Sequence, residues 1–145
     1  MILLDTNVIS ELMRPQPETA VLQWVDAQAT HDLATTTLTV AEIGAGLAVL
    51  PAGARQTDLR LRAARLLEQG FGDRIFGFDL AAAAAYGDLF ALRRRSGRPA
   101  SAVDLLIAAI AVARGMTIAT RNVADFAGCG LLVRNPWDGP VAALG

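Results

Sequence analysis

Residues 1–10, MILLDTNVIS, place three aliphatic side chains directly before an acid and two small polar residues. The aliphatic run at residues 2–4 is typical of a buried strand. A hairpin would continue with Gly or Asn-Gly, but the chain enters VISELM, which is typical of a helix. Asp5 is therefore either a helix cap or a charged group at the carboxyl end of a parallel strand.

The same order of strand and helix recurs along the chain. We expect strands at residues 2–4, 32–37, 74–78, 116–120 and 131–133, and helices at residues 8–13, 17–29, 39–50, 54–69, 80–95, 101–114 and 122–126. This alternation predicts an α/β fold with a central, mainly parallel sheet of four to five strands flanked by helices. A length of 145 residues fits one domain, residues 1–145.

The composition excludes several kinds of chemistry. All thirteen basic residues are Arg, so mechanisms that need a lysine, such as P-loop phosphate binding or a Schiff base, are excluded. A single His and a single Cys argue against a zinc site or a Ser-His-Asp triad. Any catalysis must therefore depend on carboxylates. The net charge of −1 argues neither for nor against nucleic acid.

The sequence predicts a soluble, cytoplasmic protein. Its one cysteine, Cys129, cannot form an internal disulfide, which is typical of a reducing compartment. No basic flank precedes the short N-terminal apolar run, so we expect no signal peptide. The longest apolar stretch, residues 105–113, is too short to span a bilayer, and no membrane partner is expected.

Acid and amide side chains fall at the predicted carboxyl ends of the strands, where ligands bind in open α/β sheets. Asp5 follows the first strand, and Glu42 lies in the first turn of the helix after the second. Asp104 begins the helix before the fourth strand, and Asn122 and Asp125 follow that strand. Helix N-termini at the same edge favour ionised carboxylates.

Each of these acids has a simpler interpretation as part of a helix cap. Thr39–Glu42 is a capping box, and Ser101–Asp104 and Asn122–Asp125 fit a similar template. Asp5 and Asp104 are harder to explain this way because each adjoins aliphatic residues, where an unpaired carboxylate is costly. Caps do not require acids from separate segments to meet at one edge, so their convergence favours a site.

Acids that meet without Lys or His require a cation to offset their repulsion. Ligation by oxygen alone suits Mg²⁺ or Mn²⁺, which also accept phosphate oxygens. Such ions activate water and stabilise the charge that develops when a phosphodiester is hydrolysed. The pattern therefore predicts metal-assisted cleavage of a phosphodiester.

Five short motifs occur in order along the chain: residues 1–12 (MILLDTNVISEL), Thr39–Glu42, Ser101–Asp104, Ile118–Asn122 and Asn135–Trp137. Together they resemble the PIN-domain toxins, and most closely the VapC and FitB group of type II toxin–antitoxin systems. The resemblance covers essentially the whole chain. It implies a PIN-domain fold, Mg²⁺- or Mn²⁺-dependent ribonuclease activity, and a homodimer or a toxin–antitoxin hetero-oligomer. It also implies inhibition by a cognate VapB-like antitoxin, through which alone the protein would contact operator DNA.

The resemblance also implies roles for individual residues. The metal-binding acids would be Asp5, Glu42 and Asp104, supported by Thr6, Asn7 and Thr120. The fourth acidic position of the family, commonly Asp after Thr-Arg, is Asn122 in this sequence, which keeps an oxygen ligand but loses a charge. Asp125, one helical turn later, is a candidate for the missing carboxylate, with a structural role as the alternative.

Arginines near these motifs are candidate contacts for RNA phosphates, although such a cluster also fits a solvated face. They are Arg93, Arg94, Arg95 and Arg98, before the Asp104 helix, and Arg121, within the fourth motif. The resemblance further implies a groove for an antitoxin segment near the helices of residues 17–69. Trp24 is a candidate anchor in that groove.

Three other functions fit an acidic pocket at strand ends. A degenerate PIN domain would bind RNA or its antitoxin without cleaving; Asn122 favours this alternative, and three intact acids argue against it. A phospho-receiver would need the lysine that this chain lacks. A haloacid-dehalogenase-type phosphatase would need a second Asp at position 7, which is Asn7. A PIN-domain endoribonuclease toxin is the leading hypothesis.

Overall fold

The first strand lies in the middle of a five-stranded parallel sheet. The computed structural model describes residues 1–98 and 100–140, so Pro99 and residues 141–145 of the predicted domain lie outside the described residues. Within them the strands are β1 (Ile2–Leu4), β2 (Leu33–Thr36), β3 (Ile75–Phe76), β4 (Thr117–Ala119) and β5 (Val133–Arg134). Their order is β3-β2-β1-β4-β5, and every pairing is parallel, which confirms the predicted fold class.

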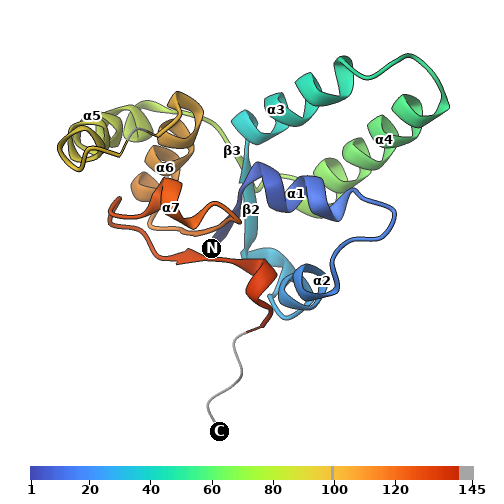
Figure 1. Cartoon of the computed structure of the whole chain (residues 1–145), viewed down its shortest axis with the longest axis horizontal. Coiled ribbons are helices and arrows are strands. Elements are labelled where there is room, and N and C mark those ends of the chain that lie inside the picture. Colours follow the sequence, from blue (N-terminus) through green and yellow to red (C-terminus); the bar gives the residue numbers. More distant parts are fainter. Residues whose placement is uncertain (99, 141–145) are drawn as a thin grey trace, which may run out of the picture.

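Helices cover both faces of the sheet. The α-helices are α1 (Thr6–Leu12), α2 (Thr19–Asp26), α3 (Thr37–Ala48), α4 (Ala54–Arg65), α5 (Leu80–Arg95), α6 (Ala102–Arg114) and α7 (Val123–Phe126). A π-helical segment, η2 (Leu66–Phe71), continues α4, and η1 (Thr30–Asp32) and η3 (Pro136–Asp138) are 3₁₀ turns. In Figure 1, α5, α6 and α7 lie on one side of the strands and α1, α3 and α4 on the other. Of the helices described, none is long and apolar enough to cross a membrane.

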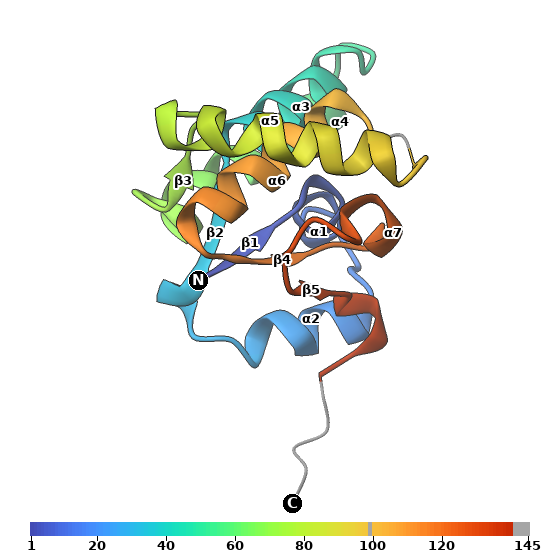
Figure 2. The same ribbon diagram turned by 90° about the vertical axis from the view of Figure 1, so that its left-hand side faces the viewer.

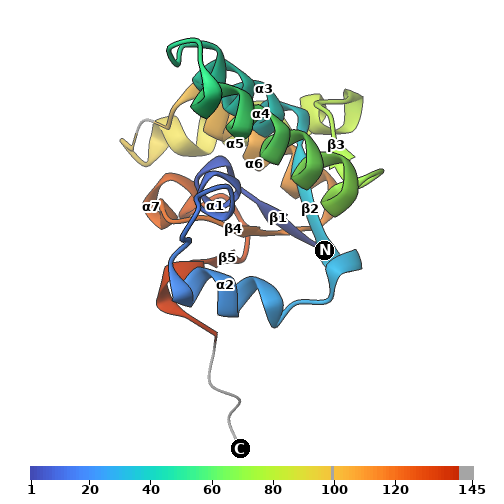
Figure 3. The same cartoon turned by 90° about the vertical axis from the view of Figure 1, so that its right-hand side faces the viewer.

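The alternation of side chains along β1 builds two cores. Leu3 is fully buried in a core that includes residues of α5, α6 and α7, and Leu4 is fully buried in a core that includes residues of α1, α2, α3 and α4. Figure 2 shows α5 and α6 side by side over the first of these faces, and Figure 3 shows α3 beside α4 on the other side. Because the helices hold the short strands from both sides, the carboxyl ends of β1 and β4 are fixed at one edge.

The apolar helix α6 forms as the sequence predicts, and its start positions Asp104. Its N-cap is Ser101, whose hydroxyl accepts a hydrogen bond from the Asp104 amide at 3.1 Å. Gly115 ends it with φ +64°, a left-handed conformation that glycine adopts without steric cost. Between these caps, Ile107 and Ile110 are fully buried.

Two predicted caps are wrong. The helix α3 begins at Thr37 rather than Thr39, with Thr36 as N-cap, so Thr39–Glu42 is not a capping box. The reason is that β2 ends at Thr36, whose hydroxyl accepts from the Thr39 amide at 3.0 Å. At α7, the Asn122 side chain makes no capping hydrogen bond, so the template at Asn122–Asp125 is not used either. Neither Glu42 nor Asn122 is therefore accounted for by helix capping.

Two predicted surface residues are buried. Trp24, the candidate antitoxin anchor, is only 4% exposed and belongs to the core under α1 and α2, so that prediction is wrong. Arg93, a candidate phosphate contact, is only 5% exposed. Its Nη1 donates to the Ala127 carbonyl at 2.8 Å and to the Ala124 carbonyl at 3.4 Å, which ties α5 to the end of α7.

Candidate active site

Asp5 ends β1 as a buried carboxylate held by three donors. It is 4% exposed, and it accepts from the Thr6 amide at 2.8 Å, from the Thr120 hydroxyl at 2.9 Å and from Asn7 Nδ2 at 3.2 Å. Burial raises the pKa of the Asp5 carboxyl above its ordinary value, and the negative charges of Asp104 and Glu42 raise it further. The Thr6 and Thr120 hydrogen bonds oppose this rise by stabilising the ionised form.

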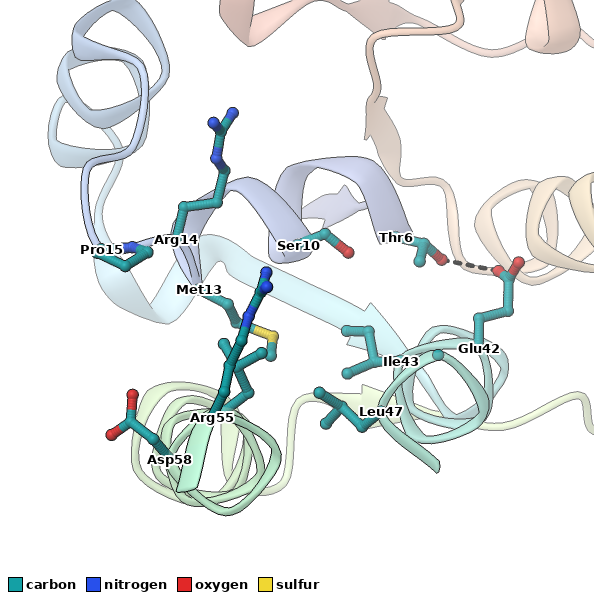
Figure 4. Close-up of a pocket in the computed structure, with 12 residues that line it drawn as sticks. Thr6, Ser10, Met13, Arg14, Pro15, Glu42, Ile43, Leu47, Arg55 and Asp58 are labelled. Atoms are coloured by element: carbon teal, nitrogen blue, oxygen red, sulfur yellow. Dashed lines mark hydrogen bonds between the residues drawn. The ribbon is translucent and has the colours of Figure 1, made fainter. Parts of the chain in front are cut away.

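Glu42 reaches the same region from α3. Its Oε1 accepts from the Thr6 hydroxyl at 2.7 Å, which Figure 4 shows as a contact across the gap between α1 and α3. The Thr6 hydroxyl also lies 3.3 Å from the Thr39 hydroxyl. Thr6 therefore touches both acids, Asp5 through its amide and Glu42 through its side chain.

Asp104 approaches from the first turn of α6. Burial raises the pKa of its carboxyl, and the charges of Asp125 and Glu42 add to the rise. Ser101 and the positive charge of Arg93 act in the opposite direction. Asp104 thus experiences acids from α3 and α7, which shows that carboxylates from three separate segments lie within electrostatic reach of one another.

Thr120, directly after β4, connects the remaining polar residues. Its hydroxyl is fully buried and accepts from the Asn122 amide at 3.1 Å and from Asn7 Nδ2 at 3.2 Å, besides donating to Asp5. Asn7 Oδ1 in turn accepts from the Arg121 amide at 3.1 Å. This network joins the carboxyl ends of β1 and β4, so the loop after β4 is held in place by side chains of α1.

One open cavity of about 550 Å³ collects these residues, and we name it the acid pocket. Asp5, Thr6, Asn7, Glu42, Asp104 and Asn122 line it, as does Arg121. The predicted meeting of four segments at one sheet edge is therefore found for these residues, whereas their chemical roles stay predictions. Asp125 does not line the pocket, although its charge reaches Asp104.

The donor set of the acid pocket fits a hard divalent cation in its chemistry. Asp5, Glu42, Asp104 and Asn122 offer oxygen ligands. The pKa values of Asp5 and Asp104 are raised first by burial and further by neighbouring acids, and a cation would offset the repulsion among these acids. Among residues 1–98 and 100–140, however, no three acid, His or Cys groups are close enough together to enclose an ion. Glu42 is exposed, and its carboxylate accepts a hydrogen bond from the Thr6 hydroxyl.

Four residues that line the acid pocket were missed from the sequence: Ser10, Glu11, Arg14 and Trp137. Glu11 is a buried acid of α1 that accepts from the Glu18 amide at 2.9 Å and pairs with Arg14 at 3.3 Å. Arg14 follows it at the helical spacing of an ion pair, which is the one sequence signal for both. The guanidinium carbon of Arg121 lies 5.1 Å from the centre of the Trp137 ring, which is a cation–π contact. The two residues are far apart in sequence, and only the fold brings them together.

The arginines predicted to bind RNA lie in different places. Arg121 lines the acid pocket and is exposed, in agreement with a role beside the acids. Arg98 is exposed but lines a separate cavity with Arg93, Arg94 and Leu105. Arg93 is buried and donates a hydrogen bond to the Ala127 carbonyl at the end of α7. It therefore does not present its charge to the surface as predicted.

A second groove, of about 570 Å³, continues from the acid pocket between α1, α3 and α4 (Figure 4). Thr6, Ser10, Arg14 and Glu42 line both. Figure 4 shows Ile43 and Leu47 projecting from α3 into this groove and Arg55 rising from α4 beside Met13. The groove thus combines apolar side chains from the end of α1 and from α3 with Glu42 at its border with the acid pocket and with Arg55 and Asp58 from α4.

Comparison with known proteins gives consistent results. The PIN domain family model matches residues 2–127. The plasmid stability protein StbB of Pseudomonas syringae pv. tomato is 47% identical over 138 residues, covering 95% of this chain and 99% of that protein. The VapC ribonuclease Y4jK of Sinorhizobium fredii is 44% identical over 138 residues, covering 95% of this chain and 99% of that protein.

A third relative has a solved structure. Toxin FitB of Neisseria gonorrhoeae is 39% identical over 94% of this chain and 99% of that protein. The crystal structure of FitAcB from the same organism superimposes with a TM-score of 0.88 and covers 94% of this chain and 99% of that one.

Proposed function

This chain belongs to the PIN-domain family, and from that premise we propose that it is the ribonuclease toxin of a toxin–antitoxin pair. Its reaction would be the hydrolysis of RNA phosphodiester bonds with a carboxylate-bound Mg²⁺ or Mn²⁺ ion. The observation that carries the proposal is the acid pocket, in which Asp5, Glu42 and Asp104 arrive from three segments far apart in sequence. The names of two relatives, VapC ribonuclease Y4jK and Toxin FitB, agree with it.

The residues that would hold the ion are Asp5, Glu42 and Asp104, with Asn122 beside them. When bound, the ion would supply an activated water and would stabilise negative charge on the phosphate oxygens. Thr6, Asn7 and Thr120 hold Asp5 in one orientation through hydrogen bonds, and Thr6 does the same for Glu42. Such second-layer hydrogen bonds keep ligand carboxylates ionised and aligned.

RNA would enter the acid pocket from its open side. Two arginines line the pocket: Arg121 lies shortly after β4, and Arg14 lies shortly after α1. Each can contact a backbone phosphate near the acids. Arg121 is the better placed, because its backbone is bonded to Asn7 and its guanidinium rests on Trp137. A planar, anchored guanidinium suits phosphate oxygens.

The partner would be a VapB-like antitoxin whose segment occupies the groove between α1, α3 and α4. The apolar side chains of Met13, Ile43 and Leu47 suit the apolar face of a helix. Because the groove opens into the acid pocket at Glu42, a basic side chain on that segment could reach the acids and block the cation. We further propose a homodimer and contact with operator DNA only through the antitoxin.

The test is cleavage of a mixed RNA pool by antitoxin-free protein in Mg²⁺, Mn²⁺ or EDTA, beside Asp104→Ala. We expect cutting that depends on the metal and is absent from the folded variant. Equal cutting by the variant would show that a contaminating nuclease or a different site is responsible. Circular dichroism of both proteins controls for folding.

Two observations favour a second function, a PIN domain that binds RNA or its antitoxin without cleaving. The described residues hold no preformed group of three metal ligands, and the fourth family acid is Asn122. A folded wild-type protein that binds RNA but cuts none of several substrates in either metal would establish this function. Metal-dependent cutting would exclude it.

A further inference from the structure

A second charged cavity adjoins α6, and its charge is opposite to that of the acid pocket. We name it the arginine pocket; its volume is about 360 Å³, and Phe90, Arg93, Arg94, Arg98 and Leu105 are among its lining residues. No acid lines it. Asp104 lines the acid pocket and the next residue, Leu105, lines the arginine pocket, so the two cavities share the first turn of α6.

The arginines of this pocket are not used in ion pairs within the fold. Across residues 1–98 and 100–140, none of Arg93, Arg94 and Arg98 forms a salt bridge. Arg93 is only 5% exposed, and its Nε is a buried donor with no hydrogen-bond partner in the described structure. Asp104 attracts the Arg93 charge, but within the described residues the buried Nε has no acceptor, and an anion in the adjoining cavity would supply one.

The remaining wall suits a nucleotide. Phe90 is 47% exposed, and its ring stacks on Tyr86 with centroids 6.2 Å apart. Aromatic side chains beside arginines are the common means by which proteins bind single-stranded nucleic acid, with stacking for bases and cations for phosphates. Leu105 adds a second apolar surface.

We propose that the arginine pocket binds a nucleotide of the RNA substrate that flanks the cleaved bond, with Arg94 and Arg98 on its phosphate. The inference rests on the proposed function for the identity of the substrate. RNA lying in the acid pocket would continue over the first turn of α6, and the arginine pocket would hold the strand beyond that turn. This subsite fixes the strand without contributing to bond cleavage.

The experiment compares Arg94→Gln/Arg98→Gln with Arg60→Gln/Arg65→Gln. Both pairs are exposed and remove two positive charges, but Arg60 and Arg65 lie on α4, on the other side of the sheet. Binding of a labelled single-stranded RNA of about 20 nucleotides, longer than a typical single binding site, is measured in EDTA at several salt concentrations. EDTA removes the divalent cation, so binding is measured without metal-assisted cleavage.

We expect the Arg94/Arg98 variant to bind about tenfold more weakly and the slope of log K against log salt to fall by about one. The control variant should stay close to wild type. Equal effects of the two pairs would overturn the proposal, because they would show only a general loss of positive charge. Unchanged RNA binding with weakened antitoxin binding would also overturn it and assign the pocket to the partner protein.

Cleavage kinetics separate this inference from the proposed function. With Mg²⁺, the Arg94/Arg98 variant should show a higher KM and an unchanged kcat, the sign of lost binding rather than lost chemistry. Arginine-dependent RNA binding by a wild type that never cleaves would uphold the pocket and refute the nuclease. Normal cleavage with a KM unaffected by the variant would uphold the nuclease and refute the pocket.

Discussion

The acid pocket and the arginine pocket share one turn of α6 but are built in opposite ways. In the acid pocket, Asp5 is 4% exposed and held by three hydrogen bonds, two from its neighbours in sequence and one from Thr120. In the arginine pocket, Arg94 and Arg98 are long, exposed side chains. Fixed geometry serves bond breaking, whereas exposed cations serve attachment to a phosphate backbone. The difference predicts that substitutions in the first pocket change rates and those in the second change affinity.

The largest expected effect is that of Asp5→Asn, which keeps the size of the side chain but removes a predicted metal-binding charge. We expect cleavage to fall at least about a thousandfold, equivalent to about 4 kcal/mol of barrier. The assay is initial-rate cleavage of RNA in Mg²⁺, with circular dichroism as the folding control. A loss of only a few-fold would mean that Asp5 is chiefly the N-cap of α1 and would remove the basis of the comparison.

The next effect concerns the hydrogen bonds that hold Asp5. Thr120→Val preserves shape but removes the hydroxyl that donates to Asp5 and accepts from the Asn122 amide. Outer hydrogen bonds of this kind typically contribute about 10- to 100-fold to metal affinity or activity, so we expect a loss in that range. Thr117→Val, at the start of β4 and outside the acid pocket, is the matched control. Equal effects of the two substitutions would indicate a disturbed β4 instead.

The edge of the sheet at which the site lies follows from sequence. Aliphatic runs fix β1 and β4, and parallel order then places Asp5 and Thr120 at one edge with the N-termini of α3 and α6. The N-cap of α3 could not be predicted from the sequence, because four of residues 35–39 are threonines and each is a possible cap. Which Thr ends the strand is decided by pairing of β2 with β3, which joins Thr36 to Phe76. That pairing is long-range and invisible in local pattern.

Burial of polar side chains was the other feature that the sequence could not supply. Arg93 stands in the run Arg93–Arg95, which is typical of a solvated helix end, yet it is buried under α7. Glu11 has the local spacing of a surface ion pair with Arg14 but is 6% exposed, because the turn after α1 folds the Glu18 amide onto it. Both depend on packing between elements, so composition and periodicity do not distinguish them from exposed neighbours.

The acid pocket should also destabilise the metal-free protein. The pKa of Asp104 is raised in the folded state, first by burial and then by Asp125 and Glu42, so folding binds its proton more tightly. Stability therefore falls as pH rises from the unfolded pKa through the folded pKa, and at neutral pH the ionised group is unfavourable. Asp104→Asn should raise the Tm of the metal-free protein at neutral pH by about 2 to 4 °C.

The control for this thermal measurement is Asp88→Asn, an exposed acid of α5. It should leave the Tm unchanged. Mg²⁺ should raise the Tm of the wild type and have little effect on Asp104→Asn, since only the folded site binds the ion. A lower Tm for Asp104→Asn would instead mean that the carboxylate supports the start of α6, as a capping acid would.

The smallest expected effect is that of Asn122→Asp, which restores the acid common at this position in the family. Asn122 is exposed, lines the acid pocket and makes no capping hydrogen bond through its side chain, so the change should not disturb α7. An added carboxylate would attract the cation more strongly, and we expect activity to stay level or rise by about two- to tenfold at limiting Mg²⁺. Titration of cleavage against Mg²⁺ is the measurement. A clear loss of activity would place the cation away from the loop after β4, and Asp125, whose charge already reaches Asp104, would then be the better candidate for the fourth acid.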